Sequence, residues 1–288
     1  MTRQLTRGGL PWLAPGIAFL ALIDLFPLAY AGGLSLYSWW IVRPASWRFV
    51  GLGNYVSLLA DPAVWRATAV STVFMGSAVL LEFVAGLGLA VFFASRSRVL
   101  DLLRPVILLP LFVTPVVSAT MWRLMFHPDL GIVNYYLQRI GLGSPSWLGD
   151  TRLAMTALVL LDAWRTIPFM FLVLHAGIVS IPHELFESAT VDGASPWQTL
   201  RYVTLPMLQY IMLVAILIRA MDAFREFDII YVVTGGGPGT STETLQLLNY
   251  RIFGFGHMGL ASALAVLTFA IVAVMSLVLL RLLARRAF

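Results

Sequence analysis

The sequence contains no cysteine and no lysine. Without cysteine, the chain cannot form a disulfide framework or a thiolate metal site. All 19 basic residues are arginines. The lysine-dependent phosphate loop of nucleotide-binding proteins and Schiff-base chemistry are therefore excluded as well.

Charge is also scarce: charged residues make up 11% of the 288 residues, whereas hydrophobic residues make up 59%. An average soluble domain has about 25% charged and about 45–50% apolar residues. The apolar residues are gathered into long blocks, and a helix of about 20 such residues crosses the roughly 30 Å of hydrocarbon in a bilayer. Most of the chain is therefore expected to lie in a membrane.

Six apolar blocks predict six transmembrane helices. A spanning backbone must satisfy its own hydrogen bonds, and these runs lack the alternating polar pattern of a barrel strand. We therefore predict an all-α, polytopic membrane protein, in which the first block is too long for a cleaved signal peptide. The blocks cover about residues 12–38, 67–94, 102–126, 153–178, 207–229 and 258–283.

The arginines predict the orientation of these helices, because cytoplasmic loops carry an excess of basic residues. The two tails and the second and fourth loops carry nine arginines, and the longer opposite segments carry seven. We expect both termini to be cytoplasmic. The net charge of +5 then reflects topology and not nucleic-acid binding, for which no basic stripe is present. The nine are Arg3, Arg7, Arg96, Arg98, Arg104, Arg201, Arg281, Arg285 and Arg286.

The loop between the fourth and fifth blocks, residues 181–206, is longer than a turn requires and has helix signals of its own. Pro182 suits the start of a helix, and Gly193 suits its end because glycine accepts left-handed geometry. A second short helix is expected from Pro196 to about Val203, ending near Pro206. The loop is predicted to form a helical hairpin at the cytoplasmic membrane surface.

The same loop carries a motif. Glu187-Ser-Ala189, Asp192-Gly193-Ala194 and Thr204-Leu205-Pro206 resemble the coupling loop, or EAA motif, of binding-protein-dependent ABC import permeases. Ser188 and the pair Val203-Thr204 depart mildly from the usual pattern, but the spacing is kept. Four further segments resemble the maltose-type carbohydrate permeases of that family: Gly51–Tyr55, Gly131–Asn134, Trp147-Leu148 and Phe227–Pro238.

The resemblance implies an assembly in the bacterial inner membrane. A core transmembrane domain of five helices covers residues 67–283 and includes the coupling loop, 1–66 form an N-terminal addition with the first helix, and 284–288 form a cytoplasmic tail. The implied partners are a second homologous permease, a dimer of cytoplasmic ATPases that carry ATP and Mg, and an extracytoplasmic solute-binding protein. The chain itself would bind no cofactor. The residues implied in coupling are Glu187, Ala189, Asp192, Gly193, Ala194, Leu205 and Pro206.

Charged residues in apolar spans are candidates for a solute path, because an unpaired charge in lipid is costly. Pairs three residues apart on one helix, such as Asp162 with Arg165, could instead neutralise each other. Aromatic residues beside charges suit a carbohydrate. The predicted solute path comprises Asp162, Trp164, Arg165, Arg219, Asp222, Phe224 and Arg225. Other charged candidates in or near spans are Asp24, Glu82, Glu226 and Asp228.

Two other classes remain open. A membrane-embedded enzyme would need a nucleophile with a base, or paired carboxylates, and no catalytic motif is recognisable among the acidic residues. A secondary transporter often has two related halves, and no internal repeat is found. The histidines show no metal-ligand spacing, so no metal site is predicted. The sequence does not identify the solute.

Overall fold

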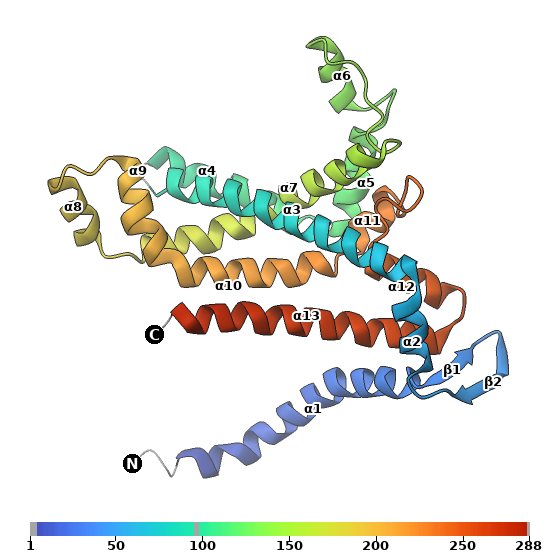
Figure 1. Cartoon of the computed structure of the whole chain (residues 1–288). Helices are drawn as coiled ribbons and strands as arrows, with labels where there is room; N and C mark the ends of the chain where they lie inside the picture. The colour runs from blue at the N-terminus through green and yellow to red at the C-terminus, as the bar shows by residue number, and fades with distance from the viewer. Residues whose placement is uncertain (1–4, 95–97, 287–288) are drawn as a thin grey trace. The chain divides into compact units, whose positions relative to one another are not determined.

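The computed structural model describes residues 5–94 and 98–286 (Figure 1). These residues form two compact units, one within Met1–Trp65 and Leu248–Ile271, the other within Arg66–Leu247 and Val272–Phe288. Arg3 and Arg96, two of the arginines used to predict orientation, lie outside the described residues. So do residues 287 and 288 of the predicted tail.

Five helices among the described residues are long and apolar enough to cross a bilayer, which confirms the prediction of a helical, polytopic membrane protein. Their apolar composition, with few charges in any 18-residue window, makes a helix the stable form in lipid. The spanning helices are α1 (Leu5–Leu34), α3 (Pro62–Phe92), α7 (Thr151–Val179), α10 (Leu205–Phe224, continuous with residues 196–204) and α13 (Met258–Arg286).

The third predicted span is not one continuous helix. Helix α4 (Arg98–Leu108) runs into a 3₁₀ turn at Leu109–Phe112, and α5 (Pro115–Met125) follows at a bend of 95°. Thr114 at the break is extended, with φ −63° and ψ 147°. A residue before proline is driven out of the helical region, so Pro115 explains the break. Counting this bent pair as one span gives the six that were predicted.

An antiparallel β-hairpin in the first unit departs from the expected all-helical chain. Strand β1 (Tyr37–Trp40) pairs with β2 (Arg43–Phe49), with Tyr37 opposite Phe49. Aromatic residues favour strands, and the ring of Tyr37 contacts those of Trp47 and Phe49 at centroid distances of 5.3 Å. The predicted first span therefore ends at Leu34 and not at Ser38.

Short helices connect the spans. The first of them is α2 (Gly53–Ala60). Its residue Asn54 donates hydrogen bonds to the carbonyl oxygens of Ser35 (2.7 Å) and Tyr37 (2.9 Å), which ties this helix to the end of α1. Such side-chain bonds fix connecting backbone that has no ladder partner. The short helices are α2 (Gly53–Ala60), α6 (Ile132–Arg139), α8 (His183–Val191), α9 (Pro196–Thr199), α11 (Asp228–Val233) and α12 (Leu245–Gly254).

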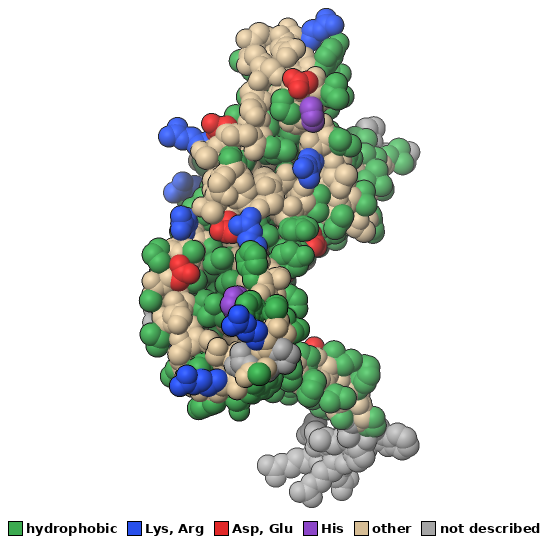
Figure 2. Space-filling view, turned by 90° about the vertical axis from the view of Figure 1, so that its right-hand side faces the viewer, with side chains coloured by type: hydrophobic (Ala, Val, Ile, Leu, Met, Phe, Trp, Pro, Cys, Tyr) green, Lys and Arg blue, Asp and Glu red, His purple; other side chains and the backbone are tan. Residues whose placement is uncertain are grey.

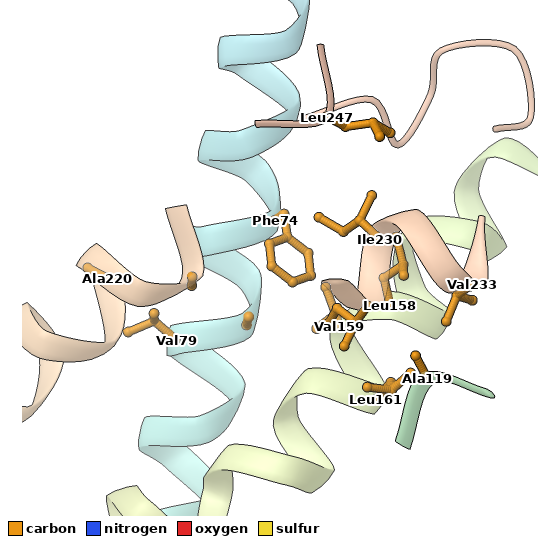
Figure 3. Close-up of a cluster of buried hydrophobic side chains, with 13 residues drawn as sticks. Phe74, Val79, Ala119, Leu158, Val159, Leu161, Ala220, Ile230, Val233 and Leu247 are labelled. Atoms are coloured by element: carbon orange, nitrogen blue, oxygen red, sulfur yellow. The ribbon is translucent and has the colours of Figure 1, made fainter. Parts of the chain in front are cut away.

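The second unit has two buried apolar clusters. In one, Phe74 of α3 packs with Leu158 of α7 and Ile230 of α11 (Figure 3). In the other, Met170 and Leu174 of α7 pack with Leu208 of α10. Helix α7 contributes to both clusters and is the most buried of the spanning helices. It is therefore the central helix of this unit.

Large apolar side chains also cover much of the outer surface (Figure 2). Examples are Val73 and Leu80 on α3 and Val274 on α13, each more than half exposed. An exposed apolar face of this extent is stable when lipid or another membrane helix covers it. The surface therefore agrees with a membrane location.

Gly86 allows α3 and α7 to approach closely. A Cβ atom at this position would lie 2.8 Å from Cβ and Cγ of Met170 and 3.1 Å from the backbone nitrogen of Phe171. Small residues at such crossings let helix backbones pack in membranes. Gly88 lies two residues further along α3, on another face of the helix. A Cβ atom at Gly88 would have nothing within 4 Å.

Gly86→Ala is therefore expected to destabilise the protein by about 1–3 kcal/mol through overpacking. Gly88→Ala is the control and should be neutral or slightly stabilising, because alanine is the better helix former. Thermal unfolding of the two variants in the same detergent measures the difference. Equal stability would mean that the α3–α7 contact is looser than described.

Candidate functional site

The predicted coupling loop begins with helix α8, which follows Pro182. Pro182 has φ −54° and ψ 131° and precedes the first helical residue, His183. Glu184 lies in the first turn, where its charge is stabilised by the positive end of the helix dipole. The predicted start of this helix is confirmed.

Helix α8 ends at the predicted glycine. Gly193 has φ +72°, its N–H donates to the carbonyl of Thr190 (3.1 Å), and the N–H of Ala194 donates to that of Ala189 (2.9 Å). This is the Schellman arrangement, in which a left-handed residue after the helix satisfies its last carbonyl groups. The Asp192-Gly193-Ala194 sequence therefore closes the end of α8, in addition to being part of the motif.

Helix α9 is capped by Ser195. Its hydroxyl accepts a hydrogen bond from the N–H of Gln198 (3.4 Å), and the Gln198 side chain accepts one from the N–H of Ser195 (2.7 Å). This capping box was missed from the sequence, although Ser-Pro-Trp-Gln carries its signature. The cap of the second helix is therefore Ser195 and not Asp192.

The second helix of the hairpin does not end near Pro206, and that prediction was wrong. A π-helical turn at Leu200–Thr204 joins α9 to α10. Proline lacks an N–H and its ring clashes with the carbonyl four residues earlier. The wider π turn lies where this clash would fall, so the helix continues through Pro206 into the membrane span.

The hairpin presents several side chains at its surface. Glu187 is 68% exposed and lies 3.1 Å from His183, and Val191 and Trp197 are large exposed apolar residues. Figure 1 shows α8 and α9 at the end of the second unit where α7 ends and α10 begins. Five of the predicted coupling residues lie together on α8 and its cap, whereas Leu205 and Pro206 start α10.

A buried ion-pair cluster joins three spanning helices of the same unit. Arg219 of α10 donates two hydrogen bonds to Glu82 of α3, at 2.6 and 2.8 Å, and a third to Asp162 of α7, at 2.8 Å. Both carboxylates are fully buried, and Arg219 is nearly so. A two-pronged guanidinium–carboxylate pair is among the strongest hydrogen-bonded contacts in proteins.

Arg165 extends this cluster toward the end of α10. Its Nη2 atom lies 3.0 Å from Asp162 and 2.9 Å from Glu226, and its buried Nε atom has no hydrogen-bond partner among the described residues. Glu226 follows the end of α10, and burial raises the pKa of its carboxyl above the usual value, with the charge of Asp162 acting in the same direction.

The sequence suggested that charged residues three apart on one helix pair with each other, and only some of them do. Asp162 does pair with Arg165, and Asp222 pairs with Arg225 at 3.3 Å. Arg219 instead pairs across helices with Glu82 and Asp162. The Asp222–Arg225 pair is half exposed, so it contributes little to stability.

A cavity of about 480 Å³ opens beside the cluster. Four predicted solute-path residues line it: Arg165, Arg219, Asp222 and Arg225. Its other lining residues are Leu111, Pro115, Thr166, Phe169, Glu226, Phe227 and Asp228. Pro115 at the break of the third span thus lies on the cavity wall.

Three predicted solute-path residues lie elsewhere. Asp162 is buried behind Arg165 and Arg219, and Phe224 is also buried. Trp164 packs against Trp122 of α5 with ring centroids 5.8 Å apart. Thr166 and Phe169 were missed, although they follow Asp162 at the four- and seven-residue spacing of one helix face.

No cluster of three or more potential metal ligands occurs within residues 5–94 and 98–286. The carboxylates of the cluster are held by guanidinium groups, which leaves them paired as salt bridges. The cavity beside the cluster offers charged groups that can form hydrogen bonds with a polar ligand. The fold is that of a multi-pass helical membrane protein.

Comparisons with known proteins identify the class. The family described as "binding-protein-dependent transport system inner membrane component" matches residues 82–288. The trehalose/maltose transport system permease protein MalF of Thermococcus litoralis is 40% identical over 233 residues, which cover 81% of this chain and 79% of that protein. The trehalose transport system permease protein SugA of Mycobacterium tuberculosis is 35% identical over 94% of this chain and 86% of that protein.

Solved structures agree on the fold. A chain from the crystal structure of a bacterial ABC transporter involved in the import of the acidic polysaccharide alginate aligns with a TM-score of 0.84. The alignment covers 98% of both chains at 23% sequence identity. At this identity the likeness shows the fold alone.

The chain therefore belongs to the family of binding-protein-dependent transport system inner membrane components. It is a multi-pass permease subunit of an ABC transport system in the inner membrane, and the ATPase of such a system is a separate subunit. Its activity is transport and not catalysis.

The cluster generates a stability prediction. Arg219→Gln leaves the buried Glu82 without its guanidinium partner and Asp162 with Arg165 alone, and removing one partner of a buried pair costs about 3–5 kcal/mol. Adding Glu82→Gln should restore part of that loss, because an amide pair keeps hydrogen bonds without the uncompensated charge. Thermal unfolding in detergent measures all variants.

Arg225→Gln is the matched control, since it changes the same residue type on the adjoining turn but at a half-exposed pair. Its effect should stay within about 1 kcal/mol. A wild-type melting temperature for Arg219→Gln would contradict the assignment of Arg219 as the central partner.

Proposed function

We propose that this chain is a permease subunit of an ATP-driven importer of carbohydrates. The observation that carries the proposal is its 40% and 35% identity, over most of the chain, to permeases whose names specify trehalose and maltose transport. A third relative, the diacetylchitobiose uptake system permease protein DasB of Streptomyces coelicolor, is 32% identical over 90% of this chain and 81% of that protein. All three names specify disaccharide transport.

The proposed assembly has four kinds of partner. A second homologous permease would pair with this chain as a heterodimer, and two cytoplasmic ATPases would bind ATP and Mg and hydrolyse the ATP. An extracytoplasmic binding protein would deliver the solute, and lipid would surround the apolar surface. The exposed apolar residues of the spans support a partner helix or lipid on these faces.

The hairpin of α8 and α9 is proposed to dock on the ATPase. Glu187 is exposed and can meet a cationic group, and Ala189, Asp192, Gly193 and Ala194 are close to it on the same helix and cap. The exposed Val191 and Trp197 add apolar surface that a partner would bury. Leu205 and Pro206 would connect this contact to α10.

The orientation and the division of the chain follow from this docking. A hairpin that contacts a cytoplasmic ATPase places both termini in the cytoplasm when six spans are counted. Within this proposal, residues 67–283 form the core transmembrane domain with the coupling loop at 181–206. Residues 1–66 form the N-terminal addition and 284–288 the tail.

The cavity beside the ion-pair cluster is proposed as part of the solute path. It combines carboxylates that accept hydrogen bonds from hydroxyl groups with the rings of Phe169 and Phe227. The ordered cluster behind it would keep these groups in place as inward-facing and outward-facing states alternate.

The docking proposal predicts that Glu187→Lys abolishes ATP-dependent uptake without loss of folded protein. The side chain is exposed, so within the chain only its surface contact with His183 is lost, whereas its charge toward the partner is reversed. Glu184→Lys is the control, with the same change three residues earlier on α8 but outside the motif. Uptake into proteoliposomes and co-purification of the ATPase measure the outcome. Wild-type uptake by Glu187→Lys would remove the coupling role.

The carbohydrate proposal predicts that the tagged chain, purified in mild detergent, brings down an ATPase and a second permease. With the binding protein added, a sugar of the trehalose or maltose type should stimulate ATP hydrolysis several-fold. A chain that purifies alone and transports without ATP would instead favour a secondary transporter. Stimulation by amino acids and by no sugar would overturn the carbohydrate class.

A further inference from the structure

The charged groups around the cavity sum to a negative value. Three arginines and three acidic residues line it, and two further carboxylates, Glu82 and Asp162, pair with the lining arginines from behind. Five carboxylates against three guanidinium groups give a formal net charge of −2. The eight residues are Glu82, Asp162, Arg165, Arg219, Asp222, Arg225, Glu226 and Asp228.

The guanidinium groups already hold carboxylate partners. Arg219 is bonded to both Glu82 and Asp162, and Arg165 is shared by Asp162 and Glu226. At the rim, Arg225 pairs with Asp222. Recognition of a carboxylate or phosphate usually takes two parallel N–H groups of one guanidinium. A ligand anion that binds one of these guanidinium groups would therefore compete with the carboxylate that it already holds.

The remaining polar groups suit a neutral ligand. The carboxylates of Asp222 and Asp228 are exposed and accept hydrogen bonds from hydroxyl groups. Phe169 and Phe227 supply apolar ring surface on the same wall.

Nearby groups do not reverse the sign. Arg123 of α5 donates to the carbonyl of Val232 at 2.9 Å and is not part of the lining. Protonation of one buried carboxyl would still leave the eight groups with a charge of −1. The negative balance therefore does not depend on a single carboxyl group.

We propose that this cavity admits uncharged carbohydrates and discriminates against anionic ones such as uronates, sulfonates and sugar phosphates. The inference rests on the proposed function, since it concerns the solute of the same cavity. Its physical basis is like-charge repulsion together with guanidinium groups that are already paired inside the protein.

The test compares matched ligands on the complete transport complex in lipid nanodiscs, without the binding protein, so that its own selectivity does not enter. The probes are trehalose and maltose and their counterparts oxidised to a carboxylate at C6. Equilibrium dialysis gives the ratio of dissociation constants, anionic over neutral. We expect a ratio of at least about tenfold for the wild-type complex.

The variant Asp222→Asn with Asp228→Asn removes two negative charges and keeps hydrogen-bonding groups. It should lower the ratio several-fold, and the change should be larger at low salt, because salt screens exposed charges. Asp129→Asn, an exposed carboxylate between α5 and α6, is the control and should keep the wild-type ratio. Both dissociation constants are measured on the same preparation, so their ratio does not depend on the fraction of complex that is active.

The outcomes separate the two proposals. Equal or tighter binding of the C6 carboxylates by the wild-type complex overturns the charge inference and leaves carbohydrate import standing. An unchanged ratio in the Asp222/Asp228 variant also overturns it. If no sugar of either charge binds, and none stimulates ATP hydrolysis, the carbohydrate function fails and the inference fails with it.

Discussion

The contact of Arg219 with Glu82 and Asp162 joins α10 to α3 and α7 in the interior of the second unit. The hydrophobic effect does not drive helices together in lipid, because lipid tails are as apolar as the side chains. A charge network is directional, and its groups have no equally good partner in hydrocarbon. This contact therefore fixes how the three helices are paired, and the apolar clusters around Phe74 and Met170 pack about that pairing.

Two of the three helices that hold the cluster, α7 and α10, also carry the hairpin. Helix α7 contains Asp162 and Arg165 and ends at Val179, directly before the hairpin, and α10 begins at Leu205 directly after it. Glycine positions make this close arrangement possible, since a Cβ atom at Gly177 of α7 would lie 2.7 Å from the Leu208 side chain of α10. The packed pair of α7 and α10 thus connects the hairpin to the cavity, which Arg165 of α7 and Arg219 of α10 help to line.

Local signals were predictable from the sequence, and long-range ones were not. Pro182 and Gly193 set the bounds of α8 through backbone preferences that act within a few residues. Composition likewise revealed the spans. The partners of Arg219 lie 57 and 137 residues away, so no spacing rule on one helix could indicate them.

Four of the seven predicted solute-path residues line the cavity, and Trp164 and Phe224 do not, because which face of a helix meets the cavity depends on tertiary packing. The β-hairpin at residues 37–49 and the π turn before Pro206 were hidden for a similar reason. The first strand overlaps the end of a predicted apolar block, and a proline inside a continuous helix resembled the end of that helix.

The π turn at Leu200–Thr204 has a mechanical consequence. Since α9, the turn and α10 form one continuous helical segment, this segment links the hairpin to Arg219, about 21 Å from Leu205 at about 1.5 Å rise per residue. The turn is the one place in that segment where the hydrogen-bond ladder is wider than in an α-helix, so it is the natural joint for bending and twisting. A torque on the hairpin can therefore either rotate the charged residues at the far end of α10 or distort the π turn. The relative stiffness of α10 and of the π turn decides how much motion reaches the cavity.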